Sequence, residues 1–326
     1  MKKILVFRHS NLGDYFLAIA SLRLLRKKYP KSYITYMTAK NRKNFSLPDK
    51  IGNEVLVDEF IFLKKKDYKD IFGLKNTIKK IKKKNFDILV YLQEYSTFLS
   101  LTKHYLFFLL CRISQNIGFK DFFKKKDYRK YSETILITKR ISNNLTSTKI
   151  RSLMNIKKFS EKRLIKKNYI TLGPGGFALG RLPEKIKTER PKKWNNNNWY
   201  TLVKLLVKKN KNIKIVFTGT QKEKNLSEQI KKKYKNNIIN TCGKTNIKSW
   251  INIIRFSDLH ICQDNGSMHL CTIFQKKNVS IFNNHDFYGK WFPLNKNAKI
   301  LRLEGDINTI QPNDVYEKVK KLLNKR

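Results

Sequence analysis

The sequence predicts an α/β protein with two domains, each built on a parallel sheet. Short apolar runs alternate with amphipathic segments in the first half of the chain, and the same alternation resumes after residue 169. Such alternation is typical of parallel sheets, in which a helix connects successive strands. With 326 residues, 40% of them hydrophobic, the chain is long enough for two domains of ordinary size.

The expected strands are short apolar runs bounded by polar or turn-forming residues. They lie at residues 4–7, 33–37, 59–63 and 87–92, and then at 169–172, 213–217, 259–262 and 279–282. Helices are expected at 16–29, 199–208, 223–234 and 247–256. A basic stretch from about 120 to 167 interrupts the alternation and is expected to be irregular. We therefore predict domains over 1–165 and 166–326.

The net charge of +47 suggests an anionic partner, but the lysines are dispersed along the whole chain. No RNA-binding aromatic motif, zinc finger or basic-region heptad is present. A solvated lysine background is the favoured interpretation. Attraction to an anionic membrane or glycolipid comes next, and nucleic acid is the least favoured partner.

The sequence favours a reduced, cytosolic protein without a structural metal. The N-terminal apolar run has only four residues before Arg8, too few for an export signal. The most apolar stretch, at 105–113, is about half of the roughly 20 residues that a membrane span requires. The four cysteines show no CxxC pairing and have apolar neighbours.

Ligands of parallel sheets bind at the carboxyl ends of strands, so the loops after the strands are the candidate sites. The first loop reads RHSNLGDYF; it is expected to turn through Asn11, Leu12 and Gly13 and to enter a helix near Tyr15. Asp14 could cap that helix, which the local sequence favours, or act as a general base toward a hydroxyl.

The loops of the second half offer weaker signals. Lys192 or Lys193, before Trp194, could hold a diphosphate or simply be solvated. Glu223 could complement a helix dipole or accept hydrogen bonds from a ribose. Gly243 would permit a turn, and Thr245 could cap the next helix.

The most specific loop is DNGSMHL, which follows an expected strand and opens an apolar helix. The backbone N–H groups of residues 265–268 would lie unpaired at the helix N-terminus and form an anion site. Asp264 would hold the turn, and the Ser267 hydroxyl would join the site. His269 could reach a phosphate or be a structural histidine.

Together these loops resemble glycosyltransferase family 9, the bacterial heptosyltransferases of lipopolysaccharide core synthesis. The first 30 residues are similar to the family's opening strand, its S-x-x-G-D turn and its first helix. FDILVYLQE and RISQNIGF are similar to later N-terminal elements, and KKW, FTGTQKE, CGKTNIKSW and DNGSMHL to the successive C-terminal loops. The resemblance covers nearly the whole chain apart from the basic stretch. It implies a GT-B fold, with two Rossmann-like domains facing a central cleft.

The resemblance also implies roles for residues. The N-terminal domain would bind the acceptor, with Asp14 as base in an inverting displacement and Ser10, Asn11 and Gly13 nearby. The C-terminal domain would bind the nucleotide-sugar, and neither metal nor cofactor would be required. The implied donor-binding residues are Lys192 with Lys193 as its alternative, Glu223 for the ribose, Gly243 and Thr245 beside the nucleoside, and Asp264, Asn265, Gly266, Ser267 and His269 for the diphosphate.

Two departures from the family pattern matter. The family usually has D-T-G-P-M-H where this chain has Asn265 and Ser267, but both replacements keep the backbone donors. After the last expected strand, FNNHDFYGKW replaces the usual F-G-x-T, which leaves the donor sugar and base open.

The expected function is transfer of heptose from an ADP-activated donor to a lipid-linked, anionic lipopolysaccharide core acceptor, in the cytoplasm or at the cytoplasmic face of the inner membrane. Residues 98–113 could contact that membrane or form an ordinary buried helix. The alternatives are a transferase with another nucleotide-sugar donor acting on capsule or O-chain, a charge-driven nucleic-acid-binding protein, and a GT-B scaffold without catalysis.

Overall fold

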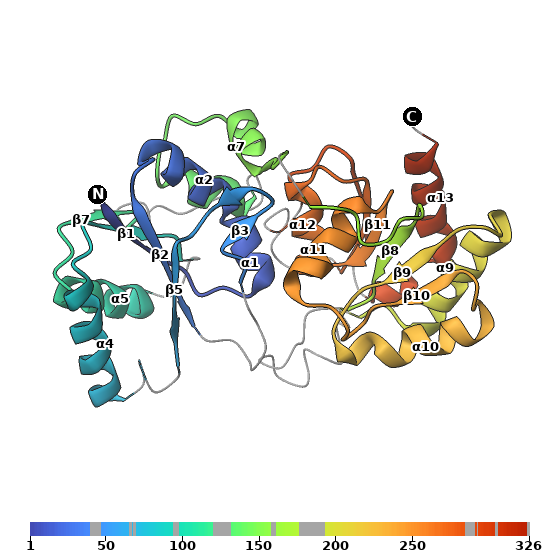
Figure 1. Ribbon diagram of the computed structural model, residues 1–326, viewed down its shortest axis with the longest axis horizontal. Helices are drawn as coiled ribbons and strands as arrows, with labels where there is room; N and C mark the ends of the chain where they lie inside the picture. The colour runs from blue at the N-terminus through green and yellow to red at the C-terminus, as the bar shows by residue number, and fades with distance from the viewer. Residues whose placement is uncertain are drawn as a thin grey trace. The chain divides into compact units, whose positions relative to one another are not determined.

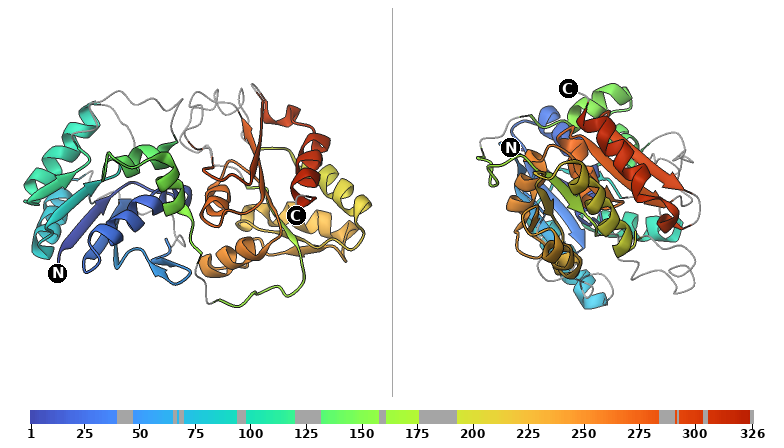
Figure 2. Two further views of the ribbon diagram at one scale, coloured as in Figure 1. Left: turned by 90° about the horizontal axis from the view of Figure 1, so that it is seen from above. Right: turned by 90° about the vertical axis from the view of Figure 1, so that its right-hand side faces the viewer.

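The computed structural model of the chain describes residues 1–39, 47–64, 67, 70–93, 98–119, 132–157, 161–175, 193–283, 291, 293–303 and 306–324. The chain divides into two compact units, one made mainly of residues 1–159 and the other mainly of residues from 160 onward (Figures 1 and 2). The expected boundary, between residues 165 and 166, lies slightly beyond this division. Each unit is described separately below.

The first unit is built on a five-stranded parallel sheet. Across the sheet the strands are β5 (Glu59–Leu63), β2 (Tyr33–Ala39), β1 (Lys3–Phe7), β6 (Ile88–Tyr91) and β7 (Gln115–Ile117). The helices are α1 (Leu12–Leu17), α2 (Ile19–Lys28), α4 (Ile71–Lys84), α5 (Phe98–Leu110), α6 (Glu133–Lys139) and α7 (Ser147–Met154). A separate antiparallel pair consists of β3 (Lys50–Ile51) and β4 (Glu54–Val55).

The central strands β2, β1 and β6 are buried on both faces, which explains their largely apolar runs. Because strand side chains alternate, Leu5 and Phe7 point to one face. There they share a buried cluster with Ile81 of α4 and with Leu101 and Phe108 of α5. Helix α2 packs with α6 and α7 elsewhere in the unit, and its N-terminal half is buried.

The basic stretch after residue 119 is not irregular throughout, contrary to expectation. Within its described part it contains α6 and α7, which pack against each other and against α2. Helix α7 buries one face through Ile150 and Met154, whereas α6 is buried on most sides, Ile135 and Ile137 included. Both helices are short and lie among lysines and asparagines, so their apolar residues stand out little in the sequence.

The second unit is built on a six-stranded parallel sheet. Across the sheet the strands are β10 (Ile238–Asn240), β9 (Ile215–Phe217), β8 (Ile170–Gly173), β11 (His260–Gln263), β12 (Asn278–Asn283) and β13 (Ala298–Leu303). The helices are α9 (Asn196–Lys209), α10 (Lys224–Lys233), α11 (Ile247–Phe256), α12 (Gly266–Ile273) and α13 (Pro312–Leu323), with the short 3-10 helices η2 (Gln221–Glu223) and η3 (Ile307–Thr309).

The core of the second unit joins the sheet to α9 and α13, which pack against each other (Figure 1). Trp194 and Trp199 are fully buried there, with their rings edge to face at 5.0 Å between centroids. All six strands are parallel, so the loops after them emerge at one edge of the sheet. This arrangement brings the candidate loops of the second half to a common edge.

No helix in the described ranges is both long enough and apolar enough to cross a lipid bilayer. All four cysteines are buried and free, as their apolar neighbours predict.

Candidate active site

Asp14, the candidate base, lies in the first turn of α1. This helix begins at Leu12 rather than near Tyr15, because Asn11 is its N-cap and Gly13 is already helical. The backbone N–H of Asn11 donates to Oδ2 of Asp14 over 2.9 Å, which is the capping contact that the local sequence favours. Asp14 is only half-buried. Capping therefore does not remove it from contact with a substrate.

A buried ion pair within electrostatic reach of Asp14 escaped the sequence analysis. Arg8 directly follows β1; it donates from Nη2 to Oε1 of Glu133 over 2.6 Å and from Nη1 to the carbonyl of Leu92 over 2.7 Å. Both side chains of the pair are almost completely buried. Burial by itself would lower the pKa of Arg8, but attraction to Glu133 and then to Asp14 outweighs it, and the pKa is raised. Arg8 is thus a fixed cation that acts on Asp14.

Ser10 holds the first loop against β2 instead of facing a substrate. Its backbone N–H donates to Oγ1 of Thr38 over 2.8 Å, and its hydroxyl shares a hydrogen bond with the hydroxyl of Tyr36 over 2.7 Å. Ser10 is buried, whereas Asn11 is exposed. Of the acceptor-side candidates, Asn11 is therefore the most accessible.

Two histidines and a glutamine line the ends of β1 and β6 and were not anticipated. The backbone N–H of His9 donates to Oε1 of Gln93 over 2.7 Å. The hydroxyl of Tyr91 and Nδ1 of His104 are 2.8 Å apart. Burial, reinforced by the nearby His9, lowers the pKa of His104 to about 4, so this ring is neutral at neutral pH. For His9 and Gln93 the available signal was their position just after apolar runs.

In the second unit, Asn265 connects the loop after β11 to the loop after β8. Its side-chain N–H groups donate to the carbonyls of Gly173 and Gly175 over 3.2 and 2.5 Å, while its Oδ1 accepts from the backbone N–H of Ser267 over 2.9 Å. Asn265 is thus the N-cap of α12 as well as a bridge between two strand-end loops. The predicted role of Asp264 in this turn stays a prediction, and Asn265 holds the turn through the hydrogen bonds given above.

A buried polar chain runs beneath this loop. Nε2 of His260 lies 2.7 Å from Oγ of Ser267, and Nδ1 of His260 lies 2.8 Å from Oγ1 of Thr171. Burial, followed by the charge of Lys276, lowers the pKa of His260 to about 3, so the ring is neutral. A Cβ on Gly173 would lie 3.1 Å from both His260 and Ser267, so a larger residue there would press on this polar chain.

The anion site at the start of α12 is smaller than expected. The N–H of Ser267 is bound by the Asn265 side chain and that of Met268 by the Asn265 carbonyl, because the N-cap satisfies them. In the described ranges the N–H groups of Asn265 and Gly266 have no intramolecular acceptor. The Ser267 hydroxyl is engaged internally, and His269 is only 5% exposed. Two backbone donors and the helix dipole remain for an anion.

Lys193 directly precedes Trp194, which is hydrogen-bonded to the residue before this loop. The backbone N–H of Trp194 donates to Oε1 of Gln263, the last residue of β11, over 3.0 Å, and its indole N–H donates to the carbonyl of Ile310 over 2.9 Å. These bonds attach Trp194 beside the start of the 264–267 turn. Lys193 is exposed. Lys192, the other candidate, falls outside the described residues, as does most of the FNNHDFYGKW segment.

Glu223 reaches the same group of loops. Its Oε2 accepts from the backbone N–H and the hydroxyl of Thr220, both over 2.7 Å. Its carboxyl carbon lies 3.2 Å from the position that a Cβ on Gly175 would occupy. Since Asn265 also binds the Gly175 carbonyl, Glu223 and Asn265 flank the same short segment after β8. Glu223 can therefore cap this turn and also take part in the candidate site.

Gly243 and Thr245 lie on the neighbouring loop. Gly243 has a φ of +71°, and its N–H donates to the carbonyl of Gly219 over 3.0 Å. This positive φ confirms the predicted turn. Thr245 is not the helix cap: Asn246 caps α11 and its side chain accepts a backbone N–H one turn later. Both residue types suit the position, and sequence alone did not distinguish them.

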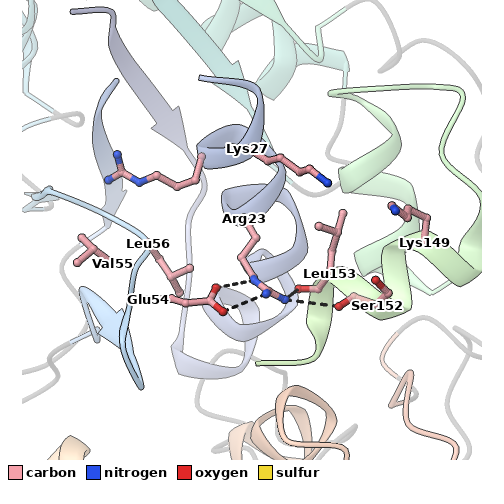
Figure 3. A pocket seen from close by; sticks show the side chains of 9 residues that line it. Arg23, Lys27, Glu54, Val55, Leu56, Lys149, Ser152 and Leu153 are labelled. Carbon is pink, nitrogen blue, oxygen red and sulfur yellow. Dashed lines mark hydrogen bonds and ion pairs between the residues drawn. The ribbon is translucent and has the colours of Figure 1, made fainter. Parts of the chain in front are cut away.

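A separate cavity of about 470 Å³ shares no residue with these loops (Figure 3). Arg23 on its wall binds Glu54 with two hydrogen bonds of 2.6 and 3.0 Å and also donates to carbonyls at the end of α7. The guanidinium therefore links α2, β4 and α7. We interpret the cavity as a structural feature, because the guanidinium of Arg23 on its wall is hydrogen-bonded within the protein.

Comparison with known proteins shows which chains this one is similar to. Residues 182–320 match the family model "Glycosyltransferase family 9 (heptosyltransferase)". A lipooligosaccharide heptosyltransferase 2 of Campylobacter jejuni strain 81116 is 32% identical over 115 residues, covering 35% of this chain and 36% of that protein. The protein of the same name from C. jejuni strain NCTC 11168 is 26% identical over 294 residues, covering 79% of this chain and 86% of the relative.

Solved structures with the same fold cover the whole chain. A family 9 glycosyltransferase from Veillonella parvula has a TM-score of 0.72 at 18% identity, covering 100% of this chain and 98% of that one. E. coli ADP-heptose lipopolysaccharide heptosyltransferase II has a TM-score of 0.65 at 18% identity, with coverages of 99% and 98%. An E. coli heptosyltransferase solved with ADP-2-deoxy-2-fluoro heptose has a TM-score of 0.67 at 13% identity, with coverages of 98% and 99%. The resemblance drawn from the sequence is thus confirmed: residues 182–320 match the model of glycosyltransferase family 9, and the chain has the GT-B fold.

Proposed function

We propose that this glycosyltransferase moves heptose from ADP-heptose to a lipid-linked lipopolysaccharide core acceptor. The observation that carries the proposal is the convergence of Glu223 and Asn265 on the segment after β8, with Lys193 attached nearby through Trp194. Such an arrangement suits a nucleoside diphosphate, because it offers a carboxylate for a ribose, backbone N–H groups for phosphate and a cation. The name of the relatives supports heptose as the sugar, and the E. coli enzyme solved with an ADP-heptose analogue supports ADP as the carrier.

In this proposal the second unit binds the donor. The N–H groups of Asn265 and Gly266 and the positive end of the α12 dipole would hold the diphosphate. Lys193 would add a positive charge, shared with Lys192. Glu223 would accept hydrogen bonds from the ribose. We assign the stabilisation of the leaving diphosphate to these groups, so the reaction would proceed without a metal.

The first unit would bind the acceptor and supply the base. Asp14 would take the proton of the acceptor hydroxyl while that oxygen bonds to the anomeric carbon. The bond from that carbon to the diphosphate oxygen breaks in the same step, and its electrons leave with ADP. A single displacement of this kind inverts the anomeric configuration. The buried cation of Arg8 would place a fixed positive charge near the Asp14 carboxylate.

The protein would act in the cytoplasm or at the cytoplasmic face of the inner membrane, where a lipid-linked acceptor is presented. Its excess of cations would favour an acceptor that carries phosphate.

Thermal unfolding with a panel of nucleotides tests the donor. A ligand at about a hundred times its dissociation constant adds roughly 2.7 kcal/mol to the free energy of unfolding, which is readily measured. We expect ADP to stabilise the protein and UDP, GDP and CMP to have little effect, with or without EDTA. Selective stabilisation by UDP or GDP would contradict the ADP assignment and favour a capsule or O-chain transferase. Stabilisation by a DNA duplex alone, lost in salt, would contradict the proposed donor site.

A further inference from the structure

Helix α5 exposes an apolar face. Four of its leucines, Leu99, Leu106, Leu109 and Leu110, are between 51% and 64% exposed. At about 100° per residue they fall within one continuous arc of the helix. On the opposite arc, Leu101 and Phe108 are buried in the cluster beneath the first sheet. The helix is therefore apolar on both its buried and its exposed side, a pattern found where the outer side also contacts an apolar medium.

The neighbouring helix α4, which lies beside α5 in the views of Figures 1 and 2, has the opposite character. Its exposed arc includes Lys75, Lys79, Lys82 and Lys83. Lys82 lies near the end of α5: burial raises the pKa of the Cys111 thiol to about 12, and the charge of Lys82 opposes that rise. Residues 71–119 contain eight Lys or Arg and only two Asp or Glu. The leucine face thus belongs to a segment with an excess of positive charge.

We propose that the leucine face of α5 docks on an anionic lipid bilayer, with the helix lying in the plane of the membrane interface. Leu99, Leu106, Leu109 and Leu110 would enter the boundary between headgroups and acyl chains, and the α4 lysines would contact anionic headgroups. With 13 residues α5 is too short to span a bilayer, which requires about 20. Shallow insertion is the membrane contact that its length permits.

The positive charge of the protein favours a bilayer over a second copy of the chain as the partner of the leucine face. Two copies meeting through this face would bring their lysine-rich borders together, and each carries a net charge of +47. Like charges brought face to face oppose association, whereas an anionic surface attracts both. The proposal does not depend on the identity of the donor sugar. It adds a surface that would bring the enzyme to a lipid-linked acceptor.

Vesicle co-sedimentation of the full-length protein tests this surface. Wild type is compared with Leu106→Gln/Leu109→Gln on vesicles of phosphatidylcholine alone and on vesicles of equal parts phosphatidylcholine and phosphatidylglycerol. We expect wild type to bind the anionic vesicles, and the double variant to bind them about tenfold more weakly, because two inserted side chains become polar. Leu164→Gln is the matched control, since Leu164 is 56% exposed but lies in the other unit.

Two further measurements separate the alternatives. Lys79→Gln/Lys82→Gln should weaken binding at low salt and flatten its dependence on salt. Unchanged thermal unfolding of the leucine variant would show that α5 remains folded. Equal binding of wild type and the leucine variant would overturn the proposal. So would a wild-type dimer that ignores vesicles and becomes monomeric in the leucine variant. The nucleotide panel does not involve this surface, so the two proposals fail separately.

Discussion

Single residues at the end of β1 combine a structural and a chemical task. Arg8 and Glu133 are buried together, and a buried charge is tolerated only when it is paired and hydrogen-bonded. The pair also ties α6 to the first strand and fixes a cation within reach of Asp14. The local fold and the charge near the candidate base thus depend on the same two side chains.

Replacing Glu133 by Gln should lower the free energy of unfolding by about 3 kcal/mol, because Arg8 is left as an unpaired buried cation. The matched control is Glu54→Gln, which breaks the partly exposed pair with Arg23; its cost should be about 1 kcal/mol or less. Urea unfolding of the two variants measures the difference. Equal costs would show that the buried pair is no more important than the exposed one.

His260 predicts how stability responds to mild acid. Its pKa is lowered to about 3 in the folded protein and is about 6.5 when unfolded, so below pH 6.5 the unfolded state binds a proton that the folded state does not. The contribution of His260 to the free energy of unfolding is therefore fully present above pH 6.5 and is lost as the pH falls toward 3. Each such histidine contributes a slope of up to about 1.4 kcal/mol per pH unit.

Between pH 6.5 and 5, where few carboxylates titrate, urea unfolding of wild type should show this loss. His104, with its pKa lowered to about 4, adds to the slope over the same interval. The His260→Asn variant should lose part of the slope. An identical slope in wild type and variant would contradict the assignment of a buried neutral ring to His260.

Among secondary-structure elements, the N-terminus of α12 contributes both to the fold and to the proposed donor site. Asn265 caps the helix and also binds two carbonyls of the loop after β8. Asn246 caps α11 in the same way. The two caps allow the stabilising role of an asparagine to be separated from its role in the site.

Asn265→Ala and Asn246→Ala should each cost about 1 kcal/mol of stability through the lost cap. Only Asn265→Ala should also weaken ADP binding, by about tenfold, because the loop that flanks Glu223 is released. Isothermal titration with ADP, alongside thermal unfolding, measures both effects. Equal loss of ADP affinity in the two variants would contradict a specific role for Asn265.

The strands that could be predicted are those buried on both faces. The expected strand at 59–63 coincides with β5, and the apolar runs at 4–7 and 279–282 lie within β1 and β12. Strands β3, β4, β7, β10 and β13 were missed: the first four have two or three residues each, and a lysine and an arginine interrupt the apolar residues of β13. Helices α6 and α7 were hidden by the lysine background. Length and apolar contrast decided which elements could be recognised.

From the sequence, only the loops that make up the candidate site could be predicted. Their order and position after strands identify the residues that converge, but not the direction in which a side chain points. Ser267 and His269 are buried, and the Ser267 hydroxyl meets His260 at the start of β11. Arg8 and Glu133 are separated by 125 positions and could be paired only by the fold.

For the whole molecule the dominant property is the net charge of +47. Few of the described lysines pair with an acid, so most of this charge is solvated and repels itself. Self-repulsion weakens with ionic strength, since the screening length falls from about 30 Å at 0.01 M to about 10 Å at 0.1 M.

The ligand-free protein should therefore unfold at a higher temperature when monovalent salt is raised from about 0.01 to 0.1 M. Sodium and choline chlorides should act alike, because screening depends on charge and not on the ion. A melting temperature that is constant or falls with salt would show that the charges are locally compensated.

The central claim is that Asp14 is the base of a heptosyl transfer. The most direct measurement is the rate of ADP release from ADP-heptose with a lipopolysaccharide core acceptor, for wild type and for Asp14→Asn, which keeps the size of the side chain. We expect the variant to lose a factor of about a hundred to ten thousand in kcat, with ADP affinity and melting temperature nearly unchanged. An Asp14→Asn variant that turns over like wild type would contradict the claim and leave Asp14 as a helix cap alone.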